Sequence, residues 1–477
     1  MTLAISLQNA VSGLQAAQAQ ISLISGNIAN AQTPGYSRQV IPTTSQIAGA
    51  REGAGVNLGV PTRLVDQALN RNISAQVGIE SAATTRDTYF QQIGSLLGTV
   101  DGGDTLGDSL SKFSNALQAV ATTPEDSAAQ ATTIAAAQQL VQQINTIGNG
   151  IQSIRINADI DINSAVTQLN ASLQQVASLN NDISRAQALG ESTAGLADQR
   201  DLAINQVAKL INIQSFARSD GTVVVLTGGG KLLADNQAQT VNFSPSLQLN
   251  ATAAVSGLSV NGVNIGSDIT SGRIGALLKV RDTDLPNLTQ ELNQFTIQLF
   301  DTTSTPNLAT TNTGAIPSIT DATHFFSGVD VNPPTPPLTP PATQDNSITL
   351  VVHPDLIANP SLLGPQSTAA ADLSTSLLTP RTFNAAGALV SPITGTLNDY
   401  ANQILAQNAN TAAQAASDTK FQTSVLSNLN QSASQVSGVN IDEELANLSS
   451  VQNAYAASAR VVSAVQEMFD SLFAIRT

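Results

Sequence analysis

From Leu3 to Ile28 the chain carries a heptad repeat of apolar or small side chains without a slip. The repeat positions are Leu3, Leu7, Ala10, Leu14, Ala17, Ile21, Ile24 and Ile28. Spacing that alternates four and three is typical of a helix that packs along a partner helix. No side chain before Arg38 carries a charge at neutral pH. The sequence therefore predicts a long, uncharged N-terminal helix that has no core of its own and needs a partner.

The end of this helix is marked by Thr33, Pro34 and Gly35. The proline ring disfavours the helical conformation of the residue before it, and glycine permits a turn. Residues 36–62 contain four glycines, at positions 49, 53, 55 and 59, and are expected to be extended.

A second apolar stripe occupies the C-terminal block, which begins near Ser437. Asn440 is a good N-cap, and Glu443 three residues later resembles a capping box. The two terminal helices are expected to pack on each other, which places both ends of the chain together. We predict that an assembly interface comprises Leu3, Leu7, Leu14, Ile21, Ile24, Ile28, Leu445, Leu448, Tyr455, Val462, Val465, Phe469 and Phe473.

Between these stripes, helical patterns cover approximately residues 63–98, 105–122, 125–188 and 193–210. At Ile211 the period changes to two, and β-hairpins are expected around Gly228–Gly230. Helix resumes near Gly272. Residues 301–394 include a proline-rich, polyproline-like segment at 332–341, and helix returns at Thr396.

The predicted fold is mainly α with β-rich inserted domains, that is, an elongated, multidomain α+β chain. Residues 1–62 and 436–477 are expected to form a terminal coiled-coil unit. Residues 63–211, 272–303 and 395–435 are expected to form a helical-bundle body. Residues 212–271 should form an outward β-rich domain, and residues 304–394 a variable, proline-rich, β-containing insert that also faces outward.

Composition excludes several classes of function. A formal charge of −15 over 477 residues argues against binding to nucleic acid or to anionic membranes. The chain has no cysteine, which excludes disulfides, thiolate catalysis and zinc–thiolate sites. No apolar run is long enough to span a membrane. The N-terminus lacks the pattern of a secretory signal peptide, so an exported chain would need another route.

Enzymatic and cofactor chemistry finds little support. The two histidines, His324 and His353, have no Gly-x-Ser-x-Gly motif beside them. The Leu226–Lys231 stretch is similar to a phosphate loop, but Leu232 stands where Ser or Thr is needed and strands rather than a helix are expected on either side, so a hairpin turn is favoured. We expect no catalytic residues, no metal site and no cofactor.

Two acidic clusters have the spacing of possible binding sites or ion pairs. The spacing of Asp159, Asp161 and Asn163 is that of the start of a calcium loop, but the required glycine is absent, so a solvated helix face is the favoured interpretation. Asp198 and Asp201 flank Arg200 and could form an ion-pair cluster within one helix. The residues alone leave a polymer subunit, a monomeric binding protein and an enzyme open, in that order.

Several motifs resemble those of bacterial flagellar axial proteins, the family of rod, hook and junction subunits. They include residues 12–14 (SGL), 27–30 (NIAN), 33–39 (TPGYSRQ), 196–201 (LADQRD) and 437–444 (SGVNIDEE). Gly26 departs from the family, which often has Asn there. The family-motif residues are Asn27, Asn30, Thr33, Pro34, Gly35, Tyr36, Ser37 and Arg38.

The resemblance implies a non-enzymatic structural subunit of the hook–filament junction, or alternatively a hook or rod subunit. It implies export through the flagellar type III apparatus with a chaperone, and an extracellular location in the flagellum. The implied partners are further copies of the chain in a ring, the hook protein and a second junction protein, with no nucleic acid and no membrane.

Overall fold

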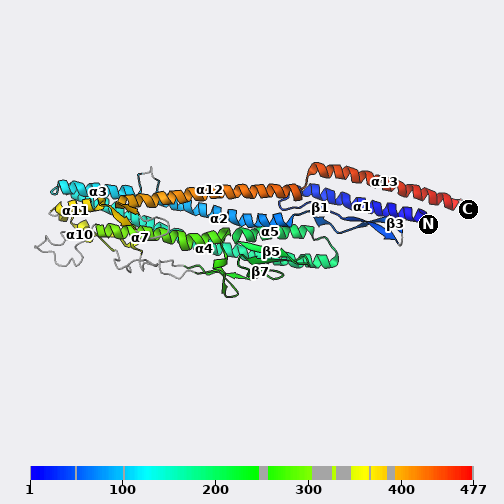
Figure 1. Ribbon diagram of the computed structural model, residues 1–477, viewed down its shortest axis with the longest axis horizontal. Helices are drawn as coiled ribbons and strands as arrows, with labels where there is room; N and C mark the ends of the chain where they lie inside the picture. The colour runs from blue at the N-terminus through cyan, green and yellow to red at the C-terminus, as the bar shows by residue number, and fades with distance from the viewer. Residues whose placement is uncertain are drawn as a thin grey trace.

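The computed structural model describes residues 2–48, 51–99, 103–246, 256–302, 325–328, 345–364, 367–383 and 393–474. The molecule is a long rod in which most helices run parallel to the long axis (Figure 1). Both chain ends lie at the same end of the rod, where α1 (Thr2–Asn30) and α13 (Ile441–Ala474) lie side by side. The predicted elongated, mainly helical fold with β insertions is confirmed.

The body of the rod is built from long helices. They are α2 (Gln67–Leu97), α3 (Leu106–Thr122), α4 (Ser127–Leu189), α5 (Ala194–Leu210), α6 (Gly272–Lys279), α7 (Leu285–Thr302) and α12 (Leu397–Ser437). With 63 residues, α4 is about 95 Å long at the usual rise per residue. Asp66, Thr105, Asp126 and Thr396 cap α2, α3, α4 and α12 through their side chains, which explains why these helices begin where they do.

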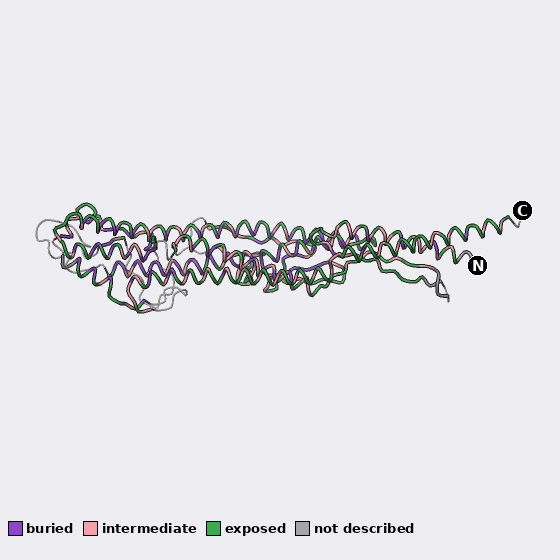
Figure 2. Tube along the Cα trace, turned by 90° about the horizontal axis from the view of Figure 1, so that it is seen from above, coloured by how far each residue is buried: buried purple, intermediate pink, exposed green. Residues whose placement is uncertain are grey.

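One hydrophobic core runs through the body. The cluster of buried residues extends from Tyr89 to Ala415 and, within the part of the chain that the structure describes, includes no residue of α1 or α13. Buried residues line the inside of the body, whereas the terminal helices are largely exposed or half-buried (Figure 2). The terminal pair is therefore attached to the body without sharing its core.

The change of period at Ile211 marks a real change of structure. Strands β5 (Ile213–Ala217), β6 (Val223–Thr227) and β7 (Leu232–Ala234) form an antiparallel sheet, with the Gly228–Gly230 turn between β6 and β7. The hairpin interpretation of this turn is confirmed. A second small sheet contains β8 (Val241–Asn242), β9 (Ser259–Val260) and β10 (Val263–Asn264), followed by the 3-10 helix η1 (Gly266–Asp268).

The interpretation of Asp159 as part of a solvated helix face is wrong. Asp159 is 1% exposed and forms an ion pair with Arg281, which is equally buried. Arg281 comes from the π-helix η2 (Val280–Asp284), a local irregularity between α6 and α7. The partner lies 122 positions along the chain, which is why the spacing of acidic residues alone gave no sign of it. Asp161 remains half-exposed and pairs with Arg273.

The 304–394 segment differs from the outward β-rich insert that we expected. Its described part forms α9 (Asn346–Thr349), α10 (Pro354–Ala358), the 3-10 helix η3 (Pro360–Leu363) and α11 (Ser367–Leu378). It also contributes the short pairs β11 (Phe326–Ser327) with β12 (Val351–Val352) and β13 (Arg381–Phe383) with β14 (Ile393–Gly395). Phe325 and Phe326 pack on Phe113 of α3, so this segment belongs to the body core. The polyproline-like stretch 332–341 lies outside the described residues.

Short strands link the terminal pair to the body. Strand β1 (Gln39–Val40) pairs with β4 (Thr62–Arg63), and the hairpin of β2 (Thr43–Ala48) and β3 (Arg51–Leu58) runs back along α1. The backbone N–H of Val56 in β3 donates to Ser12 Oγ in α1 at 3.1 Å. The extended structure expected for residues 36–62 is confirmed for the described positions.

Candidate assembly interface and its joint with the body

The predicted interface residues lie on both helices of the α1–α13 pair, some of them buried and others exposed. Ile24 is 7% exposed and Val465 is 2% exposed, so these two lie in the seam between the helices. A larger set is half-buried, namely Leu7, Leu14, Ile21, Ile28, Leu448, Val462 and Phe469. The side chains of Leu3 and Phe473 lie outside the described set. The repeat thus places at least one residue of each helix in a buried position.

Other apolar side chains of the pair face outward. Leu445 is 50% exposed and Tyr455 is 39% exposed, although the repeat placed both in the seam. Sequence reasoning omitted further apolar residues that are exposed on the same two helices, namely Ile5, Val11, Ile441, Val461 and Met468. Two helices have too little facing surface to cover this many apolar groups. The pair consequently presents apolar surface to whatever lies beside it.

The motif at the end of α1 is organised around the side-chain amide of Asn27, which is 1% exposed. Its Nδ2 donates to the carbonyl of Gln39 at 3.0 Å and to Glu444 Oε2 at 3.1 Å. Its Oδ1 accepts from the Tyr36 hydroxyl at 2.8 Å and from the Gln39 N–H at 3.1 Å. All four hydrogen-bonding positions of the amide are used, which fixes the path of the chain after α1.

Arg38 connects this turn to the C-terminal helix. Its Nε donates to Glu444 Oε1 at 2.7 Å, and its Nη2 lies 2.9 Å from Glu443 Oε1. Its backbone N–H donates to the carbonyl of Ser437 at 2.8 Å, at the end of α12. Residues 36–39 therefore lie between the end of α1 and the start of α13. We call residues 27, 36–39, 437–438 and 443–444 the joint.

On the body side, the joint meets the carboxylates of α5. Asp198 accepts from the Ser37 N–H through Oδ2 at 3.1 Å and from Arg63 Nη1 through Oδ1 at 2.9 Å. Arg63 also reaches Asp201 at 2.8 Å. Burial alone would lower the pKa of the Arg63 guanidinium, but Asp201 and Asp198 together raise it above its ordinary value.

Asp198 and Asp201 therefore connect α5 to Arg63 in β4 instead of forming ion pairs within α5. The expected cluster with Arg200 is not what the structure contains, since Arg200 donates to Asn180 Oδ1 and to the carbonyl of Gly221 instead. Sequence reasoning identified Asp198 and Asp201 but missed Arg63. No local pattern pointed to Arg63, because it lies 135 positions from Asp198 along the chain.

The turn just before residues 36–39 requires a glycine at position 35. Gly35 has φ of 78°, and a Cβ there would lie 2.7 Å from the Leu202 side chain. The Asn30 side chain donates to the carbonyl of Gly26 within α1 at 2.9 Å, and Thr33 and Pro34 are exposed. Burial first, and then the charges of Asp198 and Glu444, raise the pKa of the Tyr36 hydroxyl, which therefore stays protonated and able to donate.

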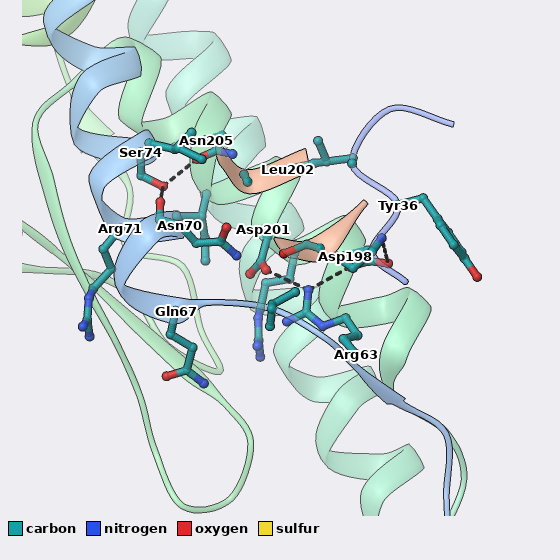
Figure 3. A pocket seen from close by; sticks show the side chains of 18 of the residues that line it. Tyr36, Arg63, Gln67, Asn70, Arg71, Ser74, Asp198, Asp201, Leu202 and Asn205 are labelled. Carbon is teal, nitrogen blue, oxygen red and sulfur yellow. Dashed lines mark hydrogen bonds and ion pairs between the residues drawn. The ribbon is translucent and has the colours of Figure 1, made fainter. Parts of the chain in front are cut away.

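A cavity of about 410 Å³ lies between the joint and the body (Figure 3). Arg63, Asp198 and Asp201 form its ionic wall, and the Ser74 hydroxyl donates to Asn205 Oδ1 on another side at 2.6 Å. Arg63 is paired with Asp198 and Asp201, and Ser74 is paired with Asn205. No arrangement of nucleophile, base and oxyanion donors is present among the residues that line the cavity.

The remaining candidates for chemistry have structural roles. His353 caps α10 by accepting from the Asp355 N–H at 3.4 Å. His324 lies outside the described residues. Across the described ranges, the structure has no group of three or more His, Cys, Asp or Glu side chains placed to hold a metal ion, and none of its helices could cross a membrane.

The fold and joint define a class of rod-shaped proteins whose two chain ends form one exposed helical pair. Three family models match the chain in the corresponding places. The model of the flagellar hook-associated protein FlgK helical domain matches residues 90–309. The model of the flagellar basal body rod FlgEFG protein C-terminal region matches residues 430–475, and that of the flagella basal body rod protein matches residues 7–36. The predicted resemblance to flagellar axial proteins is confirmed.

Individual relatives carry a more specific name. The chain is 26% identical to flagellar hook-associated protein 1 of Salmonella typhimurium, covering 98% of this chain and 99% of the relative. It is 25% identical to the protein of the same name from Escherichia coli over the same shares. The structure of the flagellar hook junction protein FlgK from Burkholderia pseudomallei matches 49% of this chain and 43% of that chain, with 22% identity and a TM-score of 0.43. The chain is similar in sequence to flagellar hook-associated protein 1 over almost its whole length.

Proposed function

We propose that the chain is a structural subunit of the bacterial flagellum that forms the junction between hook and filament and is required for filament assembly. The similarity to flagellar hook-associated protein 1 over almost the whole chain supports this function. The observation that carries it is the apolar surface that α1 and α13 leave exposed, including Leu445 and Tyr455. Exposed apolar surface of this kind is typical of a protein–protein interface.

The proposed assembly is a ring in which copies of the chain cover each other's terminal helices. Complete burial of a large apolar side chain contributes about 1.5–3 kcal/mol relative to exposure. Several such residues per subunit would therefore favour association strongly. The hook protein would lie below the ring, and the second junction protein, hook-associated protein 3, would lie above it.

Export is proposed to proceed unfolded through the flagellar type III apparatus, with a chaperone before secretion, to an extracellular position in the flagellum. A chain without cysteine has no disulfide that would need reduction before passage. The terminal helices, which share no core with the body, are expected to order fully only on assembly. The role is structural, without enzymatic activity or a cofactor.

Deletion of residues 441–477 tests this function. The deletion removes α13 but leaves the body core, which ends at Ala415, complete. We expect a folded body that cannot join filament to hook, so that cells complemented with the deleted chain carry hooks without filaments. Normal filament growth in those cells would refute the proposed function.

A second candidate is a hook or rod subunit, because the matches at both chain ends are to rod-protein models. Antibody labelling of purified hook–basal bodies with attached filaments separates the two. Label confined to the hook–filament boundary supports the junction. Label along the hook or the rod supports the alternative.

A further inference from the structure

Glu444 occupies an unusual position in the joint. It lies in the first turn of α13, yet its side chain is 2% exposed. Each of its oxygens has a different partner in the N-terminal part of the chain, with Arg38 Nε on Oε1 and Asn27 Nδ2 on Oε2. The neighbouring Glu443 also contacts Arg38 but is 53% exposed. One buried carboxylate therefore joins segments that are more than 400 positions apart.

Neither side of this contact is complete without the other. If residues 27–39 are unfolded, the Glu444 carboxylate loses both of the partners that fix the start of α13. If α13 is absent, the Arg38 Nε and one Asn27 N–H lose their acceptor. The same segment is held to the body through Ser37 and the Arg38 backbone, which contact Asp198 and Ser437.

We propose that Glu444 is a positioning residue that makes the two terminal helices order together rather than separately. Its carboxylate is the contact through which α13 stabilises the turn after α1, and through which that turn holds the start of α13 against the body. The inference concerns the same surface as the proposed function but does not depend on the hook–filament role.

The cysteine-free chain offers a direct measurement. Gly13 of α1 faces Ser458 of α13, and a Cβ at Gly13 would lie 3.3 Å from Ser458 Oγ. The two side-chain positions are therefore in direct contact, which favours a disulfide between cysteines placed there. In the Gly13→Cys/Ser458→Cys variant of the full chain, the rate of oxidative cross-linking of the monomer therefore reports the fraction of time for which the helices are paired, even when that fraction is small.

We expect Glu444→Gln in this background to slow cross-linking about tenfold, the factor typical of one hydrogen bond to a charged group. A glutamine accepts through one oxygen only, so its NH₂ would face one of two donors, Arg38 or Asn27. Glu443→Gln is the matched control: its carboxylate is 53% exposed, so its ion pair with Arg38 contributes little, and this change should slow cross-linking much less than Glu444→Gln does. Circular dichroism and the protease resistance of residues 67–437 verify that the body stays folded.

A double-mutant cycle adds a readout that a general loss of stability would not produce. Arg38→Met should slow cross-linking as Glu444→Gln does, and the combined variant should be no slower than either one. Equal rates for Glu444→Gln and Glu443→Gln, additive effects of Arg38→Met and Glu444→Gln, or no cross-link in the parent pair would each overturn the proposal. None of these outcomes bears on where the protein assembles, since the monomer is measured.

Discussion

The side chain of Asn27 and the backbone of Gln39 satisfy each other's hydrogen bonds. Asn27 Nδ2 donates to the Gln39 carbonyl at 3.0 Å, while the Gln39 N–H donates to Asn27 Oδ1 at 3.1 Å. The amide thus takes the place of a neighbouring strand for one residue of the chain. This pairing turns the polypeptide out of α1 and directs it toward β1, and it gives the 27–30 motif a structural role.

Asn27→Ala should open the turn after α1. The substitution leaves the partly buried Gln39 N–H and carbonyl without their partner, at a cost of roughly 1 kcal/mol for each hydrogen bond. Hydrogen exchange at the Gln39 amide should therefore become faster. Asn30→Ala is the control from the same motif, because the Asn30 side chain donates to a carbonyl of its own helix. Similar exchange at Gln39 in both variants would contradict the role assigned to Asn27.

Gly35→Ala should weaken the attachment of the joint to α5. A non-glycine residue at φ of 78° costs roughly 1–2 kcal/mol. The approach to the Leu202 side chain matters less, because that side chain is 41% exposed and can rotate away. Faster exchange of the Ser37 amide, which donates to Asp198, measures the effect.

Two further variants separate strain from clash at this glycine. Asparagine tolerates the left-handed conformation better than alanine does, so Gly35→Asn should cost less than Gly35→Ala. Adding Leu202→Ala to Gly35→Ala should change little. Recovery on addition of Leu202→Ala would show that the side-chain contact, rather than the backbone, sets the cost.

Val465→Asp should abolish filament formation. Val465 is 2% exposed in the α1–α13 seam, and a charge placed there has no partner to offset its loss of hydration. Phe469→Asp, at a half-buried position one turn further, should act in the same direction. Gln466→Asp adds the same charge at an exposed neighbouring position and should leave filaments intact. Motility and electron microscopy of complemented cells provide the measurement. Filaments of normal length with Val465→Asp would refute the seam.

The parts of this fold that follow from local pattern were predictable. The heptad repeat gave α1, Pro34 and Gly35 gave the turn after it, and the shift of period at Ile211 gave the β5–β6–β7 sheet. These features depend on neighbours within a few residues along the chain. The capping residues of the body helices are local in the same sense.

Contacts between distant positions were not predictable. The pairing of Arg63 with Asp198 spans 135 positions, and that of Asp159 with Arg281 spans 122. No periodicity connects such partners. The 345–378 helices were missed for a different reason, since Pro354, Pro360 and Gly364 divide that segment into pieces too short to show a helical period.

Arg281→Met should destabilise the body by about 3–5 kcal/mol, the usual cost of breaking a buried ion pair from one side. The variant leaves Asp159 buried without its cation, and it also removes the hydrogen bond from Arg281 Nη2 to the Ser256 carbonyl at 3.1 Å.

Chemical denaturation of the full chain measures the loss of stability. Arg218→Met is the matched control, because Arg218 is 45% exposed and lies 3.9 Å from Asp235.

Neutralising the orphaned acid should restore part of this stability. The Arg281→Met/Asp159→Asn variant has no buried charge at the site, so it should be more stable than Arg281→Met alone. A double variant as unstable as the single one would show that packing, rather than charge, dominates at the π-helix.

Asp345→Asn should change how the stability of the body depends on pH. Burial raises the pKa of the Asp345 carboxyl above its ordinary value of 3.8, although hydrogen bonds from Ser347 and Asn293 oppose the shift. The folded state therefore binds more protons than the unfolded state between 3.8 and the raised value. The free energy of unfolding must fall as pH rises through that window. Asparagine keeps an acceptor for the Ser347 N–H but cannot titrate, so the stability of the variant relative to the parent should increase with pH across the window.

Denaturation of both chains from below 3.8 to neutral pH measures this difference in stability. A difference that is constant, or that decreases with rising pH, would contradict a carboxyl whose pKa is raised by burial.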